Sequence, residues 1–524
     1  MTIAESPKAG RREWIGLAVI ALPCLLYSMD LTVLYLALPS LTADLEPSSS
    51  ELLWITDIYG FFLAGLLITM GTLGDRVGRR RLLLIGAAAF GVASVFAALS
   101  TSVEMLIVSR ALLGVAAATL APSTLSLIRN MFLDPGQRTF AIGVWATSFS
   151  VGAALGPLLG GVLLEFFWWG SVFLLAVPVM ALLLVLGPRL LPEFRDPAAG
   201  RLDLVSAGLS IVAVLAVVYG LKRIAESGLG WTAVLSIAAG FAIGLVFLRR
   251  QRALADPLID LDLFRSRSFN AALAANTLSL AIAFGIFLFI AQYLQLVVGL
   301  SPLEAGLWTV PSAGGFIAGS MLAPVAVRHV RPGFVAAGAL VLAAFGLWLV
   351  AQVDGDSQLA LIVIASIVIA LGIAPPVTLA TDLVVGCVRP ERAGVASGLS
   401  ETGAELGGAL GIALLGSIGV AVYRDQMADA LPNSVSPEQA DAAEETLSSA
   451  LEVVEELGDV RGTRLLETAQ EAFVQSMQVA ALVAAAVALG TAALAALFLR
   501  RTGTGSPSVP SAADADLAAE GVRS

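Results

Sequence analysis

Apolar residues run along this chain in long blocks, and short polar segments separate the blocks. A helix of about 20 apolar residues crosses a bilayer. By that measure the pattern predicts an all-α integral membrane protein with fourteen transmembrane helices. These cover residues 14–39, 52–73, 82–100, 103–127, 139–164, 169–188, 204–221, 231–249, 269–298, 303–327, 333–352, 358–386, 394–422 and 472–499. No small-residue cleavage site follows the first block, so we expect it to remain as a helix.

Composition supports the membrane assignment and narrows the chemistry. The 524 residues are 58% hydrophobic and 13% charged, with a mean hydropathy of +0.89, which excludes a soluble domain of this length. The chain holds one histidine, His329, and two cysteines, Cys24 and Cys387, and these form no metal-ligand spacing. With no phosphate loop, nucleophile elbow or metal set, we expect no enzyme activity, no cofactor and no nucleic-acid partner.

The distribution of positive charge predicts the orientation of the chain. With the N-terminus inside, 24 of the 30 Lys and Arg residues fall on inner segments and five on outer segments, and Arg110 lies within the fourth span. Inner loops of membrane proteins carry the excess of Lys and Arg. We therefore expect both termini to be cytoplasmic.

One predicted outer loop is long and acidic. The loop covers residues 423–471, and between Arg424 and Gln470 it contains eleven acidic residues against three arginines. Ser436, Pro437 and Gln439 follow the pattern of a helix start, so we expect a short helix from about 437 to 456, and a second helix leading into the last span is a further possibility. The loop is either a solvated surface or a cover whose negative field attracts cations. The tail after Arg501 has the composition of a disordered segment.

Two pairs of segments repeat at a nearly constant spacing. Residues 141–156 reappear at 396–411, and residues 53–65 reappear at 307–319. The pairs face the same way across the membrane, so the halves are parallel pseudo-repeats, a known transporter plan. Two spans have no counterpart, which predicts a 6+2+6 arrangement. The predicted domains are a cytoplasmic N-terminus (1–13), an N-terminal half (14–188), an inserted two-helix segment (189–268), a C-terminal half (269–500) and a cytoplasmic tail (501–524).

The segment between the second and third spans combines glycines with charges. Glycines permit a tight turn between closely packed helices, and an aspartate there can meet a helix N-terminus or an arginine. The stretch resembles the loop signature of the major facilitator superfamily. A basic loop that only sets topology is the alternative interpretation. The residues of the motif are Gly71, Gly74, Asp75, Arg76, Gly78, Arg79, Arg80 and Arg81.

The fifth span carries a run of small residues around a proline. Small residues let helices approach closely, and a proline bends a helix. The run is similar to the antiporter motif of the same superfamily, which in that family marks exporters rather than importers. The resemblance therefore favours export. The residues are Gly152, Gly156, Pro157, Gly160 and Gly161.

Three charged residues lie within the N-terminal spans at similar depth. Asp30 lies in the first span, Asp57 in the second and Arg110 in the fourth, where the last matches another family motif. Charges at such depth are costly and mark functional sites. We expect one cluster with two carboxylates on the Arg110 guanidinium, and a structural ion pair is the alternative. Trp54 and Tyr59 flank Asp57 and could attract cations or serve packing.

Acidic residues in the C-terminal half complete the candidate site. Glu401 and Glu405 are four residues apart in span 13 and therefore share a helix face, with Glu405 near mid-membrane and Glu401 one turn nearer the cytoplasm. The repeat aligns them with Ala146 and Ser150, so they are not required by the scaffold. Asp382, at the inner end of span 12, is either functional or merely solvated.

Over nearly the whole chain the sequence resembles the fourteen-span drug:proton antiporters of the superfamily, and within them exporters of quaternary ammonium compounds, dyes and antiseptics. The resemblance implies that Asp30 and Glu405 carry protons while Asp57, Glu401, Trp54 and Tyr59 contact a lipophilic cation. It implies transport driven by the proton gradient, by a monomer in the lipid bilayer of a bacterial cytoplasmic (inner) membrane. Some such exporters carry an acid in span 10, where this chain has none, so monovalent cations are expected to be preferred.

Two other functions remain open on the same scaffold. An exporter of a lipid, a siderophore or another endogenous metabolite would have a more cationic interior and fewer buried acids. A sensor that transports nothing would show no dependence on a proton gradient. Efflux of a cationic dye, measured with and without an uncoupler, separates these alternatives.

Overall fold

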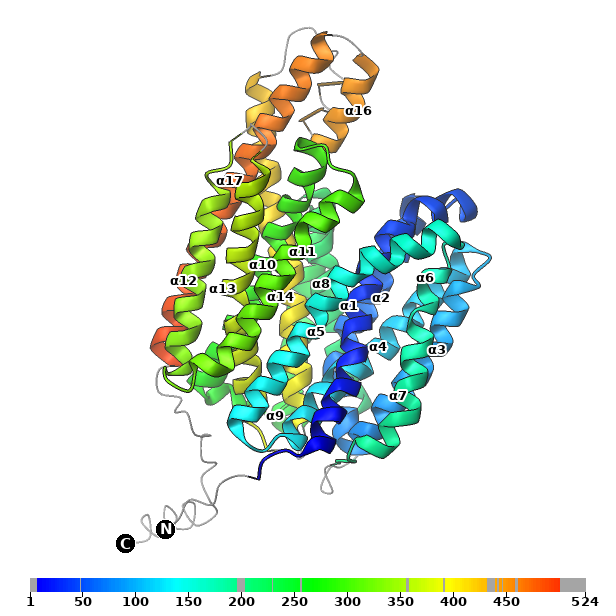
Figure 1. Cartoon of the computed structure of the whole chain (residues 1–524), viewed down its shortest axis with the longest axis vertical. Helices are drawn as coiled ribbons and strands as arrows, with labels where there is room; N and C mark the ends of the chain where they lie inside the picture. The colour runs from blue at the N-terminus through cyan, green and yellow to red at the C-terminus, as the bar shows by residue number, and fades with distance from the viewer. Residues whose placement is uncertain are drawn as a thin grey trace.

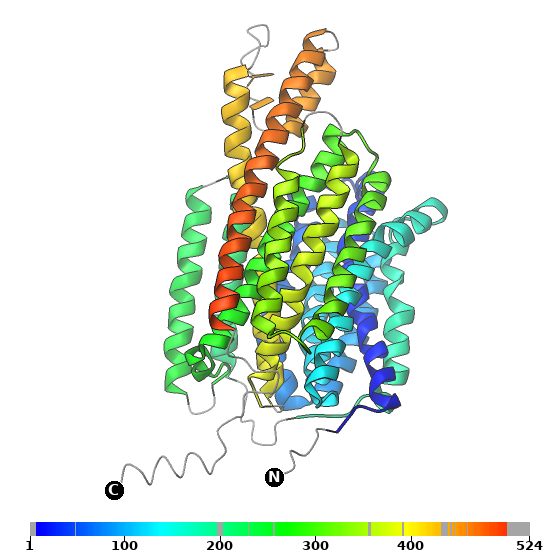
Figure 2. The same cartoon turned by 60° about the vertical axis from the view of Figure 1, so that its left-hand side comes forward.

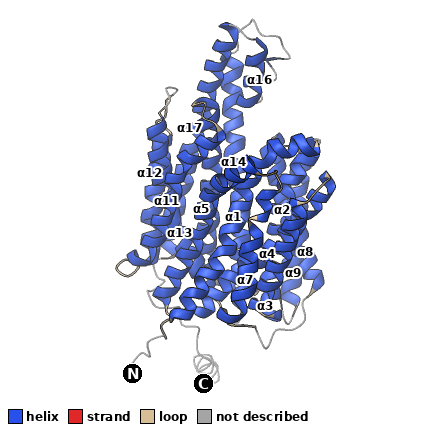
Figure 3. Ribbon diagram, turned by 45° about the vertical axis from the view of Figure 1, so that its right-hand side comes forward, coloured by secondary structure: helices blue, strands red, loops and turns tan. Residues whose placement is uncertain are grey.

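The computed structural model describes residues 7–47, 49–195, 203–228, 230–254, 257–354, 358–389, 392–430, 439–440, 443–444, 446–457 and 460–499. Within these residues the chain forms helices and loops and no strand (Figure 3). Fourteen helical segments are long and apolar enough to cross a membrane, which confirms the prediction. The predicted disordered tail lies outside the described residues.

The helices follow the predicted spans closely, with several extended at their ends. The N-terminal helices are α1 (Arg11–Leu45), α2 (Ser49–Val77), α3 (Arg79–Ala98), α4 (Val103–Met131), α5 (Pro135–Phe166), α6 (Ser171–Leu174) and α7 (Ala176–Leu190). Next come α8 (Leu204–Ser227), α9 (Trp231–Ala253) and the 3-10 turn η1 (Leu261–Arg265). The remaining helices are α10 (Arg267–Gln292), which ends in the π-turn η2 (Tyr293–Val297), α11 (Pro302–Ala326), α12 (Pro332–Val350), α13 (Leu359–Gly386), α14 (Ala393–Ala430), α16 (Leu447–Leu457) and α17 (Val460–Phe498).

The helices pack as two groups with a pair beside them. In the N-terminal group α1 packs against α5 and α2 against α4, and in the C-terminal group α10 packs against α14 and α11 against α13 (Figure 1). The groups meet where α2 contacts α14 and where α5 contacts α11. Helices α8 and α9 pack on each other at the side of the bundle (Figure 2), and α8 also contacts α2 and α14. The residue boundaries of the domains remain a prediction.

Repeat-related glycines make equivalent helix contacts in the two groups. A Cβ atom added to Gly152 of α5 would lie 2.1 Å from the backbone oxygen of Leu25 in α1. A Cβ added to Gly407 of α14 would lie 2.3 Å from the backbone oxygen of Thr277 in α10. Small residues at such crossings let the two backbones touch. The same sequence pattern thus produces the same close crossing twice.

Helix α5 continues without a break through the predicted antiporter motif. Gly156 and Gly160 are buried along the helix, while a Cβ on Gly161 would meet no atom within 4 Å. Pro157 lies in the same helical segment. Gly156 and Gly160 of the motif are therefore buried, whereas Gly161, on the same helix, has space for a side chain.

Most of the predicted acidic loop is helical. Helix α14 continues to Ala430 and α17 begins at Val460, so both extend beyond the rest of the bundle (Figure 3). Between them α16 spans Leu447–Leu457, and the described residues 439–440 and 443–444 are also helical. The predicted helix-start residues 436–438 lie outside the described residues. Helix α16 buries Leu447, Ala450 and Val453 in the C-terminal hydrophobic core. Its apolar side therefore explains why the segment folds back on α17.

Replacing Gly152 by Ala should destabilise the fold, because the new methyl group would overlap the backbone of α1 at Leu25. Overpacking of this kind costs about 1–3 kcal/mol. The expected result is a lower midpoint of thermal unfolding for the purified protein in detergent.

Gly161→Ala is the matched control for this substitution. It adds the same methyl group to the same helix at a position with open space, so the unfolding midpoint should not fall. Equal midpoints for the two variants would contradict the close crossing of α1 and α5.

Candidate functional site

A buried ion pair joins α1 to α4 inside the N-terminal group. The Arg110 side chain is 0% exposed, and its Nη1 donates to Oδ2 of Asp30 at 2.5 Å. Its Nε also donates to the backbone oxygen of Ile55 in α2 at 3.2 Å, and its guanidinium lies 4.7 Å from the centre of the Tyr59 ring. The predicted pairing of Asp30 with Arg110 is therefore confirmed.

Two polar atoms beside this pair have unused hydrogen-bonding capacity. Among the described residues, neither Nη2 of Arg110 nor Oη of Tyr59 has a hydrogen-bond partner. Both side chains are fully buried, and buried polar atoms are normally satisfied. These two donors are thus available to water or to a polar group that enters the bundle.

Asp57 does not share the Arg110 guanidinium, so the predicted three-residue cluster is wrong. Its carboxylate pairs with the ammonium of Lys222, which comes from α8. The prediction is wrong because it treats Lys222 only as one of the five positive charges on the outer segments. A lysine side chain is long enough to reach from a helix end toward a neighbouring helix.

Aromatic rings surround the Asp57–Lys222 pair. The Lys222 ammonium lies 5.2 Å from the centre of the Phe61 ring, and Phe61 has Trp54 at 6.2 Å and Tyr219 at 6.3 Å between ring centres. Trp54 is 45% exposed. This combination of a carboxylate and aromatic rings is one that attracts cations.

Glu405 is linked to the N-terminal group through a tyrosine that sequence reasoning missed. The hydroxyl of Tyr27 in α1 donates to the Glu405 carboxylate in α14. The Tyr27 ring also lies 6.2 Å from the Tyr59 ring and 5.5 Å from the Phe149 ring. The signal was available, because Tyr27 precedes Asp30 by three residues and therefore lies on the same side of α1.

Glu401 and Glu405 both lie on α14 as predicted, and both side chains are partly buried. Tyr27 and Tyr59 connect the Glu405 carboxylate to the surroundings of Arg110 through ring contacts. The predicted site residues Asp30, Tyr59 and Glu405 therefore surround one region between α1, α2, α4 and α14, which we call the acidic centre. Asp57 and Lys222 lie beside it at the contact with α8.

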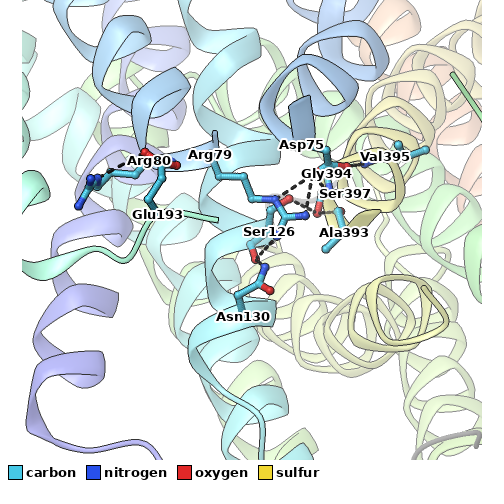
Figure 4. A network of polar contacts seen from close by, with 10 residues as sticks. All are labelled: Asp75, Arg79, Arg80, Ser126, Asn130, Glu193, Ala393, Gly394, Val395 and Ser397. Carbon is cyan, nitrogen blue, oxygen red and sulfur yellow. Dashed lines mark hydrogen bonds and ion pairs between the residues drawn. The ribbon is translucent and has the colours of Figure 1, made fainter. Parts of the chain in front are cut away.

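Both groups are joined by polar contacts at the end of the bundle where α1 begins and α17 ends, which we call the terminal end (Figure 1). Asp75 accepts hydrogen bonds from Arg79, at 2.6 and 2.8 Å, and from the backbone nitrogens of Gly394 and Val395, at 3.0 and 3.1 Å (Figure 4). Those nitrogens belong to the first turn of α14, where a carboxylate is favoured. Asp75 thus meets both predicted types of partner.

The remaining residues of the loop motif shape the turn that positions Asp75. Gly78 has φ +117°, a conformation that side chains disfavour, and Arg76 is partly buried at the end of α2. A Cβ on Gly71 would lie 2.3 Å from the backbone oxygen of Gly394. Glycine at position 71 therefore permits direct backbone contact between α2 and α14.

An ion pair also joins the two groups at the terminal end. Nε of Arg138 in α5 donates to Asp382 in α13 at 2.5 Å, and the Thr139 hydroxyl donates to the same carboxylate at 2.7 Å. Both Arg138 and Asp382 are buried. Asp382 is therefore not merely solvated, and sequence reasoning missed Arg138 because it lies just outside the predicted span.

The described residues form fourteen membrane-length helices, arranged as two packed groups with a pair beside them and with an ion pair between the groups. This arrangement is that of a polytopic membrane transport protein. Residues 20–412 match the Major Facilitator Superfamily. The chain belongs to this superfamily of transporters and is not an enzyme. It is therefore a multi-pass membrane protein, as its spans predict.

Several relatives align along nearly their full length. The chain is 44% identical over 490 residues to the multidrug efflux pump LfrA of Mycolicibacterium smegmatis, covering 94% of this chain and 97% of that protein. It is 34% identical over 475 residues to the methyl viologen resistance protein SmvA of Salmonella typhimurium, covering 90% and 94%. It is 33% identical over 510 residues to the tetracenomycin C resistance and export protein of Streptomyces glaucescens, covering 95% and 94%.

Solved structures support the fold. The human organic anion transporter MFSD10 superposes with a TM-score of 0.58 at 15% identity, covering 91% of this chain and 99% of that one. A bacterial homologue of the lysosomal transporter Spinster, in an inward-facing conformation, superposes with a TM-score of 0.55 at 18% identity, covering 93% and 98%. At these identities the likeness concerns the fold alone.

Replacing Asp30 by Asn should destabilise the protein, because Arg110 would keep its charge without a carboxylate partner. Loss of one member of a buried ion pair costs about 3–5 kcal/mol. The midpoint of thermal unfolding in detergent should fall, and adding Arg110→Met to Asp30→Asn should recover part of the loss.

Asp262→Asn provides the control, since it breaks an exposed pair with Arg265. Exposed pairs contribute little, so its unfolding midpoint should match that of the unmodified protein. If the unfolding midpoint of Asp30→Asn equals that of Asp262→Asn, this would contradict the expectation that the buried Asp30–Arg110 pair stabilises the fold.

Proposed function

We propose that this chain is a proton-coupled antiporter that exports lipophilic cationic drugs, with a preference for monovalent cations. The observation that carries the proposal is the acidic centre. At this centre Asp30 and Glu405 lie near the partly buried Tyr27 and the buried Tyr59, where the two groups meet. The relatives support drug export, since their names describe multidrug efflux, methyl viologen resistance and tetracenomycin C export.

The chemistry of exchange follows from the cost of a carboxylate inside a membrane. Such a group is stabilised by a proton, by a cationic partner or by hydrogen-bond donors. A proton and a lipophilic cation can satisfy the same carboxylate in turn, so binding of one favours release of the other. In this proposal Glu405 performs the exchange directly, with Tyr27 holding its carboxylate in place when no cation is bound.

Asp30 takes part in a different way, because its carboxylate already has a cationic partner. In the proposal the Arg110 contact loosens in one conformation, and Asp30 then takes up a proton. The free donors on Arg110 and Tyr59 accommodate water or the displaced groups during that step. The bound cation is contacted by the carboxylate of Glu401 and by the aromatic rings of Trp54 and Tyr59.

In the proposal, relative movement of the two helix groups gives a cation access to the acidic centre. We place the terminal end in the cytoplasm, because the loops there carry most of the Lys and Arg residues. The contacts of Asp75 with α14 and of Arg138 with Asp382 close that end. Rocking of the groups about the acidic centre would break these contacts and admit a cytoplasmic cation. The proton gradient drives the cycle without a further cofactor.

Everted membrane vesicles that contain the protein should accumulate ethidium in their lumen against its gradient when a proton gradient is present, because their cytoplasmic face points outward. An uncoupler should abolish this transport, because the carboxylates then exchange no net protons. Dye fluorescence over time measures the rate. Transport that continues unchanged with the uncoupler would contradict proton coupling, and export of lipids or siderophores without dye transport would favour the alternative function.

Glu405→Gln should abolish uphill ethidium transport while dye equilibration down its own gradient continues. Glutamine keeps a hydrogen bond to Tyr27 but cannot exchange a proton or a full negative charge. The same vesicles, with and without the proton gradient, separate the two modes of transport.

Glu304→Gln is the matched control in the same group of helices. Glu304 caps the start of α11 at the surface, where it accepts bonds from Ser301, and glutamine also serves in such a capping box. Uphill transport should persist. Uphill transport by Glu405→Gln at the control rate would contradict the role given to Glu405.

A further inference from the structure

Lys222 is a positive charge that the transport scheme above does not use. It lies on α8, one of the two helices that have no counterpart in the repeat, and its ammonium pairs with Asp57 of α2. The two side chains are 30% and 23% exposed, so the pair is neither a fully solvated surface contact nor a sealed core contact. An ion pair in such a place can be opened by a competing charge.

The surroundings of the Lys222 ammonium are those of a site for an organic cation. A carboxylate faces it from one helix, and the Phe61 ring lies 5.2 Å away. The Trp54 and Tyr219 rings each lie next to the Phe61 ring and extend the aromatic surface. Aromatic rings with a carboxylate bind ammonium groups from ligands by the same forces that hold this lysine.

Lys222 also lies close to the acidic centre. Helix α8 packs against both α2 and α14, the helices that carry Asp57 and Glu405. The Lys222 ammonium therefore lies beside two helices that each carry a carboxylate. A ligand with a single positive charge can occupy Glu405 while Lys222 keeps Asp57, but a second ligand charge near Asp57 would meet a like charge.

We propose that Lys222 is a tethered cation that occupies the Asp57 site and thereby restricts the exporter to ligands with one positive charge. This inference rests on the proposed function and adds a specificity-determining residue to it. It assigns a role to the inserted helix α8, which supplies the competing ammonium. It also replaces the missing acid of span 10 as the physical reason for a preference for monovalent cations.

Lys222→Met is the variant that tests the proposal, because methionine keeps a long, flexible side chain and removes the charge. The purified full-length protein is titrated with tetraphenylphosphonium, a monocation, and with methyl viologen, a dication. The affinity for methyl viologen relative to tetraphenylphosphonium should rise roughly tenfold, as expected when a like charge is removed and a close opposite-charge contact becomes available. An unchanged ratio would overturn the proposal.

Two further variants connect the effect to Asp57 and to the position of the charge. Asp57→Asn added to Lys222→Met should remove the gain, because no carboxylate is left for the second ligand charge. Arg223→Gln removes a positive charge from the next position of the same helix and should leave the ratio unchanged. A gain that persists without Asp57, or an equal gain from Arg223→Gln, would contradict the proposal.

The single variant Asp57→Asn keeps the proposal testable if Lys222→Met fails to fold. It frees the Lys222 ammonium to compete for Glu405, so tetraphenylphosphonium should bind several-fold more weakly, on the order of the coupling between close charges. Binding equal to that of the unmodified protein would overturn the inference. Failure of the unmodified protein to bind tetraphenylphosphonium would instead contradict the proposed function itself.

Discussion

A charge inside the membrane needs a partner, and this requirement accounts for much of the helix arrangement. Asp30 binds Arg110 across α1 and α4, and Asp57 binds Lys222 across α2 and α8. Glu405 accepts the hydroxyl of Tyr27 across α14 and α1. Each contact joins two helices that apolar packing alone would leave free to rotate, because lipid tails solvate apolar side chains as well as other helices do. The polar contacts therefore determine which sides of the helices face one another.

The same requirement makes the bundle suitable for switching. The two groups touch at the terminal end through the Asp75 carboxylate on the first turn of α14 and through Arg138 on Asp382. Opening that end leaves these groups without partners, so the cost has to be offset by new contacts elsewhere. In the proposed function, uptake of a cation at the acidic centre changes the charge balance between the same groups of helices. In the proposed cycle, ligand binding and opening are coupled through this exchange of partners.

Sequence reasoning found the site residues whose depth and helix side can be counted along one helix. Asp30 and Arg110 have matching depths and form the expected pair. Glu401 and Glu405 lie one turn apart on α14. The motif that contains Asp75 has a recognisable sequence, and Asp75 meets the expected helix N-terminus. The prediction for Asp57 is wrong. Because Asp30 and Asp57 lie at similar depth, both are expected to pair with Arg110, whereas Asp57 pairs with Lys222. Depth does not distinguish between partners on different sides of a helix. Lys222 was overlooked because a flexible side chain reaches well beyond the position of its backbone.

The sequence by itself determined the number of spans, the parallel repeat and the family resemblance. Hydropathy, motif spacing and repeat offset are properties of the linear chain, and a membrane helix satisfies its backbone hydrogen bonds within itself. Only the tertiary structure decided that Asp57 meets Lys222, that Tyr27 meets Glu405 and that Arg138 meets Asp382. It also showed that the predicted acidic loop continues α14 and α17 as helices. The three side-chain pairings depend on helix rotation and on contacts between residues more than a hundred positions apart, which no local pattern encodes.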